Sequence, residues 1–290
     1  MGETSIGTRR LVAVASLKPR AWLLTFRSGS SKNEGEEIRL DLPEPVLALF
    51  EELPNPDCLL DGGTLPSVTT PPSHDCEIIF LPAGSATPFP LQKAAEGWIA
   101  EDPSGTGARQ SVIEISFQGA RVLRAVGKIV IVGDQDWPVR KGIAQFEWIC
   151  KQLCRLEECI VNQWETSGED ATFFYLSRAG RSFQQRAGVT AAQTSAAKYW
   201  LIRAETLLDR SDLIAPPIAR RVFLELCLRT EIAARMKAAE RAVDAIHLLY
   251  EQAFMRLSEK REAGRSLLIE IFILLAILAE VALYVWELWF

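Results

Sequence analysis

The last 25 residues of the chain are strongly apolar, and they constrain its fold more than any other feature. Residues 266–290 read SLLIEIFILLAILAEVALYVWELWF and contain no Lys, Arg, Pro or Gly. As a helix, such a segment spans roughly 36 Å, enough for a hydrocarbon core about 30 Å thick. We therefore predict one C-terminal transmembrane helix over residues 266–290. Tyr284, Trp286 and Trp289 would be its interfacial aromatics. A buried core helix and an interfacial amphipathic helix are the alternatives.

Three glutamates, Glu270, Glu280 and Glu287, interrupt this apolar segment. At about 100° per residue they fall within one sector of about 100° around a helix. A polar stripe in a membrane helix generally faces another helix or a water-filled path. We expect a homo-oligomer in contact with membrane lipid, or a second membrane or soluble protein as partner. The alternative is that Glu270 and Glu287 reach water at the two interfaces.

Basic residues precede the apolar segment, namely Arg256, Lys260, Arg261 and Arg265. Cytoplasmic flanks of membrane helices are enriched in Lys and Arg. The sequence therefore predicts a single-pass, tail-anchored membrane protein. Its N-terminal body would lie in the cytoplasm of a bacterium, below the inner membrane, or face the mitochondrial matrix.

A long coiled-coil-like helix is predicted over residues 215–265. Pro216 and Pro217 suit a helix start, because proline in the first turn loses only donors that are already unpaired. Gly264 is the expected joint. Apolar residues follow at alternating steps of four and three, which is a heptad seam: Ile232, Met236, Ala239, Val243, Ile246, Tyr250, Ala253 and Leu257. The seam packs either on a second copy or on this chain's own preceding helices.

The rest of the chain predicts an α+β domain over residues 1–135 and an amphipathic helical layer over 136–214. Strand patterns occur at residues 9–17, 21–26, 38–42, 76–82, 112–117 and 120–133. Helical spacing of apolar residues occurs at 139–164 and 190–208. The predicted fold class is thus an α+β soluble domain, a helical layer and a long helix that continues into one transmembrane helix.

No constellation of residues predicts catalysis, a cofactor or a metal. The net charge of −5 gives no basic field for nucleic acid. The six cysteines include Cys150, Cys154 and Cys159 on one predicted helix, and we interpret them as reduced thiols. His74 and Cys76 near Cys58 lack the paired spacing of a strong zinc site. His247 lies beside the heptad seam and is interpreted as a packing residue. We do not expect an enzyme.

The order of elements resembles the Rmd/Sif-type family, which is named for a requirement in meiotic nuclear division. The resemblance covers about residues 110–287. It rests on GIAQFEWICKQLCRLEECI, on AAKYWLIRAETLLD, and on the stretch from HLLYEQAFM to LLAILAEVAL, with Glu280 inside the apolar segment. It implies a membrane-bound oligomer and no catalytic residues. A CorA-type magnesium channel has a similar order of elements, but it requires two spans and a Gly-Met-Asn signature, which this sequence lacks.

These patterns favour an oligomeric scaffold or tether that acts through the long helix and the membrane span. One alternative is an ion- or proton-conducting oligomer lined by the three glutamates. A ligand-sensing membrane effector is the other.

Overall fold

The structure is a computed structural model. It describes residues 18–27, 36–40, 43–53, 60, 75–83, 89–101, 111–117, 119–175, 181–214 and 216–289. The chain forms two compact units. The first, the sheet unit, comprises Met1–Gln152 and Arg203–Ala233; the second, the helical unit, comprises Leu153–Ile202 and Ala234–Phe290. The side chains of several helical residues also lie outside the described part.

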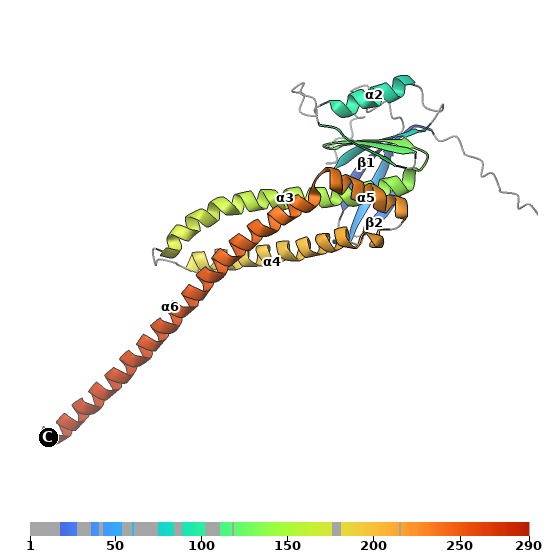
Figure 1. The fold of residues 1–290 in the computed structure, drawn as a ribbon. Helices are drawn as coiled ribbons and strands as arrows, with labels where there is room; N and C mark the ends of the chain where they lie inside the picture. The colour runs from blue at the N-terminus through green and yellow to red at the C-terminus, as the bar shows by residue number, and fades with distance from the viewer. Residues whose placement is uncertain are drawn as a thin grey trace, which may run out of the picture. The chain divides into compact units, whose positions relative to one another are not determined.

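The sheet unit contains a seven-stranded mixed sheet with the order β2-β3-β1-β4-β7-β6-β5 (Figure 1). Its strands are β1 Arg20–Arg27, β2 Glu36–Leu40, β3 Val46–Leu53, β4 Cys76–Pro82, β5 Ile113–Phe117, β6 Ala120–Ala125 and β7 Lys128–Gly133. Strands β4 and β7 pair in parallel and the other neighbours are antiparallel. Two tight turns join β5 to β6 and β6 to β7. In each, a glycine (Gly119, Gly127) takes the positive φ that other residues rarely adopt.

Both faces of this sheet are covered, so its central strands are apolar on both sides. Helix α2, Phe89–Ala100, packs Trp98 and Ile99 onto one face, where Ile79 and Leu81 of β4 lie. The first part of α3, Asp136–Tyr175, and α5, Pro217–Arg229, belong to the same unit. They lie on the opposite side of the sheet from α2 (Figure 1). Burial on both faces explains why β4 reads CEIIFLP instead of an alternating pattern.

Helices α3 and α5 approach each other closely at Gly142. A Cβ built on this glycine would overlap the carbonyl oxygen of Ala219 and lie 2.9 Å from Cβ of Val222. Only glycine fits such a contact without a shift of the backbone.

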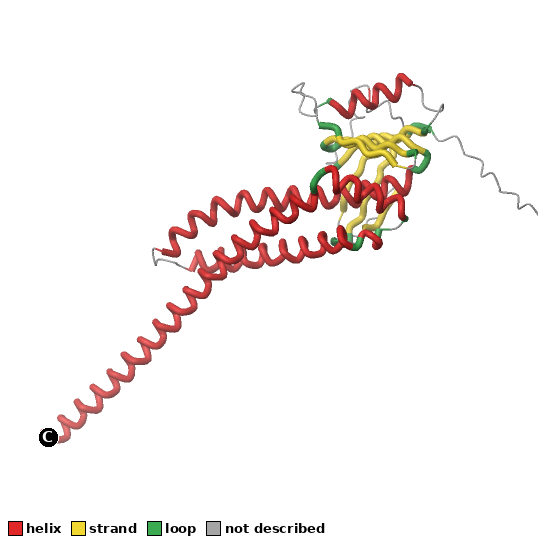
Figure 2. Tube along the Cα trace, viewed as in Figure 1, coloured by secondary structure: helices red, strands yellow, loops and turns green. Residues whose placement is uncertain are grey.

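The helical unit consists of the second part of α3, most of α4, Arg181–Asp209, and α6, Ile232–Trp289 (Figure 2). All three helices contribute to a small apolar cluster: Ile160 from α3, Ala187 from α4, and Ile246, Tyr250 and Ala253 from α6. The heptad seam faces into the protein, because its members from Ile232 to Ala253 are at most 5% exposed. This burial corresponds to the alternative in which the seam packs on the chain's own helices.

The strand patterns at 21–26, 76–82, 112–117 and 120–133 are confirmed, with ends that agree to within one or two residues. The pattern at 38–42 is confirmed over residues 38–40, and residues 41–42 and the pattern at 9–17 lie outside the described residues. The helices expected at 139–164 and 190–208 are also confirmed, in α3 and α4. Strand β3 and helix α2 were not predicted. The joint of the long helix was predicted at the wrong place. The chain breaks at Thr230 and Glu231, where Glu231 has φ 53°, and Gly264 lies inside α6.

The predicted transmembrane helix over 266–290 is wrong. Among the described residues, no helix combines the length and the apolarity that crossing a membrane requires. The charges supply the physical reason. Glu270 and Glu280 interrupt the predicted span and Arg265 stands directly before it, and a charged side chain near the centre of a bilayer costs roughly 2.5–3.5 kcal/mol. The tail-anchored topology and the membrane localisation that followed from this helix are corrected with it.

Candidate assembly surface and polar cavity

The C-terminal part of α6 exposes an unusual amount of apolar surface. Beyond Ala253, every described side chain of this helix is exposed. They include thirteen large apolar side chains, each 44–70% exposed: Leu267, Leu268, Ile269, Ile271, Phe272, Ile273, Leu274, Leu275, Ile277, Leu278, Val281, Leu283 and Trp286. We call residues 265–286 the apolar segment of α6.

The exposed area of this segment is large for a single chain. At roughly 100 Å² for each of the thirteen side chains, it amounts to about 1,300 Å². The largest apolar patch on a typical monomer is about 300–600 Å². The apolar side chains also surround the helix instead of forming one stripe, which is typical of a helix that is covered on several sides.

Charged side chains occur at intervals along this part of α6. Arg256 and Arg265 are exposed toward its beginning, and Glu270 and Glu280 are exposed further along. Trp286 is exposed as well. The side chains of the remaining predicted residues here lie outside the described part: Leu257, Lys260, Arg261, Tyr284, Glu287 and Trp289. Of the three glutamates that were predicted to form a membrane stripe, Glu270 and Glu280 are therefore exposed.

A polar cavity lies in the helical unit. Its volume is about 700 Å³. Its lining comes from α3, α4 and α6: Gln163, Thr166, Gln185, Arg186, Val189, Thr190, Gln193 and Tyr250. Arg186 is the one charged residue of this described lining. Nε2 of Gln163 donates to Oε1 of Gln193 across 2.9 Å, which joins α3 to α4 at the cavity.

The chemistry of the cavity follows from these side chains. Amides and hydroxyls both donate and accept hydrogen bonds, and arginine adds a positive charge with a planar set of donors. Such a lining suits a small polar ligand with a negative charge. The sequence did not reveal this site, because its residues are scattered over three helices and form no local motif.

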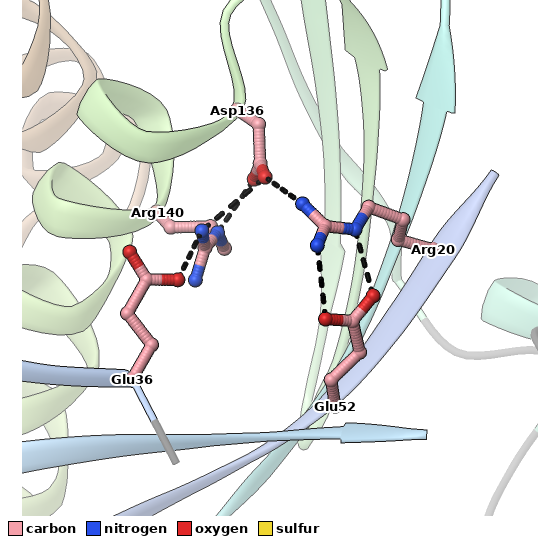
Figure 3. A network of polar contacts seen from close by, with 5 residues as sticks. All are labelled: Arg20, Glu36, Glu52, Asp136 and Arg140. Carbon is pink, nitrogen blue, oxygen red and sulfur yellow. Dashed lines mark hydrogen bonds and ion pairs between the residues drawn. The ribbon is translucent and has the colours of Figure 1, made fainter. Parts of the chain in front are cut away.

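A second polar cluster holds the start of α3 to the sheet (Figure 3). Arg140 is only 2% exposed, and its guanidinium carbon lies 4.3 Å from the ring centre of Trp22 and 4.9 Å from that of Phe50. Its Nε donates to Asp136 across 2.5 Å, and its Nη2 donates to Glu36 across 2.7 Å. The network was not predicted.

Arg20 extends this network. It donates from Nε to Glu52 across 2.7 Å and lies 3.5 Å from Asp136. Burial raises the pKa of Asp136 even though Arg140 and Arg20 act in the opposite direction. Each carboxylate of the cluster already has an arginine beside it. We therefore interpret the cluster as a structural clamp between the sheet and α3.

The cysteines divide into buried and exposed thiols. Cys76, Cys150 and Cys227 are buried, whereas Cys154 and Cys159 are exposed on α3. Burial raises the pKa of Cys76 and Cys227. Cys58 and His74 lie outside the described residues. Within the described part of the chain, no three potential metal ligands gather in one place.

Two polar contacts join helices inside the helical unit. Nδ1 of His247 lies 3.2 Å from Oγ1 of Thr194, whose hydroxyl donates to the carbonyl of Ala191. Arg235, which lies four residues after Glu231 in the sequence, bonds Glu157 of α3 across 2.6 Å. The first contact ties α6 to α4, and the second ties α6 to α3.

Comparisons with known proteins do not assign a family. No family model matches the chain, and no curated protein matches it. One solved structure to which it is similar is the CorA magnesium transporter from Methanocaldococcus jannaschii. The identity is 8%, and the match covers 88% of this chain and 81% of that one with a TM-score of 0.37. A similarity at this level supports no statement about function.

Proposed function

We propose that the chain is a self-assembling scaffold, in which copies associate through the apolar segment of α6. The observation that carries the proposal is the run of thirteen exposed, large apolar side chains beyond Ala253. Apolar surface of this extent is rare on a monomer and marks an interaction site.

The exposed apolar area of the segment favours a second copy of the chain as the partner. A stable interface buries about 800 Å² per partner, and the segment offers about 1,300 Å². The segment is also present once on every copy, so association between copies covers it on all of them at once. Association would increase the number of sheet units in one particle. A particle with several sheet units binds a multivalent target with higher avidity than a single chain does.

The test is the mass of the full chain in solution, measured by sedimentation over a range of concentrations. We expect particles of a multiple of 32.3 kDa. The double variant Phe272→Glu/Leu278→Glu should be monomeric, because an exposed apolar side chain on each of two sides of the segment becomes charged. Leu228→Glu is the matched control: Leu228 is 72% exposed but lies on α5. A wild-type chain that stays monomeric at tens of micromolar would contradict the proposal.

The polar cavity favours a second candidate function, the sensing of a small anionic ligand. The support is a 700 Å³ cavity whose one charged lining residue is Arg186. Inorganic phosphate and succinate are suitable probes, and binding should raise the melting temperature of the full chain. Gln193→Leu should remove the shift, whereas Ser195→Ala, on the same helix but outside the lining of the cavity, should keep it. Unchanged melting with both probes would speak against this candidate.

The ion-conducting alternative requires a membrane span, so it loses its basis together with the predicted transmembrane helix.

A further inference from the structure

The charges along the apolar segment are arranged asymmetrically. Arg265 stands at its beginning, and Glu280 stands fifteen residues later; both side chains are exposed. The two positions are roughly 22 Å apart along the helix at 1.5 Å per residue. Fifteen steps of about 100° leave them roughly 60° apart around the axis. They therefore lie on the same side of the helix, near its two ends.

Apolar and small residues fill the space between these charges on that side. Ile269, Phe272 and Ala276 follow Arg265 at steps of four, three and four, and all three are exposed. Leu283 continues the series and is 70% exposed. This spacing forms a second heptad seam, separate from the one between Ile232 and Leu257. The small side chain of Ala276 allows two helices to approach closely near the centre of this second seam.

We infer that two copies of the chain pair antiparallel through this seam, with Arg265 of each chain beside the partner's Glu280. The inference rests on the proposed self-assembly and adds its direction. In an antiparallel pair, a two-fold axis between Phe272 and Ile273 brings positions 265 and 280 to the same level, because their numbers are symmetric about that point. Opposite charges then meet twice in each pair.

A parallel pair in the same register has the opposite result. It places Arg265 beside the partner's Arg265, and Glu280 beside the partner's Glu280. Like charges at equal levels oppose association, whereas complementary charges set the orientation and register of paired helices. The charge pattern of this seam thus selects the antiparallel direction.

The face on the other side of the helix is also apolar. Its members follow one another at steps of four and three: Leu267, Ile271, Leu274, Leu278 and Val281. Glu270 lies at the edge of this face, roughly 140° around the axis from Arg265. The face is available for contact between antiparallel pairs. The complete particle is therefore expected to contain an even number of chains.

Charge reversal tests the direction, with the association constant of the full chain measured by sedimentation. Arg265→Glu alone and Glu280→Arg alone should each weaken association roughly tenfold or more, because each creates two repulsive contacts per pair. The double variant Arg265→Glu/Glu280→Arg should restore the association constant to within about threefold of wild type. In parallel pairs, each single reversal only exchanges one like-charge contact for another and leaves association unchanged.

A zero-length carbodiimide cross-link gives a second, independent readout. In the Arg265→Lys variant, an antiparallel pair should yield a cross-link between positions 265 and 280, identified by mass spectrometry. The distance of roughly 22 Å within one helix prevents this link from forming inside a single chain. The Ala263→Lys variant is the control for nonspecific coupling near this end of the segment.

The outcomes separate the two proposals. A monomeric wild-type chain would contradict the self-assembly and, with it, the antiparallel pairing. A stable oligomer that ignores both single reversals and gives no 265–280 cross-link would overturn the antiparallel pairing and leave the self-assembly in place. Weakening by each single reversal, recovery in the double variant and the inter-chain cross-link together support it.

Discussion

Arg140 is the side chain whose environment is most demanding. A buried guanidinium is stable only when its charge is matched. Arg140 meets this condition, although its Nη1 makes no hydrogen bond to the described residues. Asp136, whose side chain is 11% exposed, supplies the matching charge from the same helix, and Glu36 supplies a second carboxylate from β2. The rings of Trp22 and Phe50 lie against the guanidinium. The clamp thus joins α3 to three neighbouring strands of the sheet.

Arg140→Met should lower the free energy of unfolding by roughly 3 kcal/mol, as expected when one partner of a buried ion pair is removed. Methionine keeps an apolar stem of similar length, so the loss reports mainly the charge and its hydrogen bonds. The measurement is urea unfolding followed by circular dichroism. Arg121→Met is the matched control, since Arg121 bonds Glu114 and Glu96 while 35% exposed, and should cost at most about 1 kcal/mol. Equal losses would contradict the distinction.

The buried and the exposed thiols are expected to differ in their reactivity toward iodoacetamide. Iodoacetamide reacts with the thiolate, so a buried thiol with a raised pKa is protonated and unreactive at pH 8. Burial raises the pKa of Cys76 and Cys227, whereas Cys154 and Cys159 are exposed on α3. In the folded chain, Cys154 and Cys159 should be modified within minutes, and Cys76 and Cys227 only after unfolding. Peptide mapping distinguishes the sites; rapid native labelling of Cys76 would contradict the described burial.

The buried arginine was not predictable from the sequence, and the reason is the distance along the chain. Arg140 and Glu36 are 104 residues apart, and Arg20 and Glu52 are 32 apart. Each of these residues, considered alone, resembles an ordinary surface charge. The strand order β2-β3-β1 and the contacts of α3 with these strands bring them together.

At the scale of elements, local patterns predicted most strands and helices, and local context explains the failures. Strand β3, VLALFEEL, begins with five apolar residues and has two adjacent glutamates before its last residue, so it shows no regular alternation. Helix α2 begins at Phe89-Pro90 directly after a loop-like stretch rich in proline. The junction at Glu231 lacks both glycine and proline, so no residue type signals the break between α5 and α6.

The two glycines of α3 provide a matched pair of substitutions on one helix. Alanine is favoured over glycine in a helix by about 1 kcal/mol. At Gly142 the new Cβ would overlap the carbonyl oxygen of Ala219, whereas at Gly168 nothing lies within 4 Å. Gly142→Ala should therefore destabilise the chain by roughly 1–3 kcal/mol, and Gly168→Ala should stabilise it by up to about 1 kcal/mol. Urea midpoints measure both; a stabilising Gly142→Ala would contradict the close packing of α3 on α5.

For the whole molecule, the largest difference between the sequence-based prediction and the structure concerns the apolar segment. The composition of residues 266–290 predicted a membrane span, and the described helix does not qualify as one. The large apolar surface is nevertheless present and exposed. Apolar composition alone does not distinguish burial in lipid from burial against other copies, because both remove the same side chains from water.

Removal of residues 266–290 separates the folding of one chain from its assembly. The last buried residue described on α6 is Ala253, so a chain ending at residue 265 loses no described buried side chain. It should unfold in urea with a free energy within about 0.5 kcal/mol of that of the full-length Phe272→Glu/Leu278→Glu variant, which also does not assemble. The wild-type chain differs from both, because association stabilises the folded state by mass action. Its urea midpoint should rise with protein concentration, while the midpoints of the other two stay constant.

A wild-type midpoint independent of concentration, or a shortened chain several kcal/mol less stable than the double variant, would show that the apolar segment packs within its own chain.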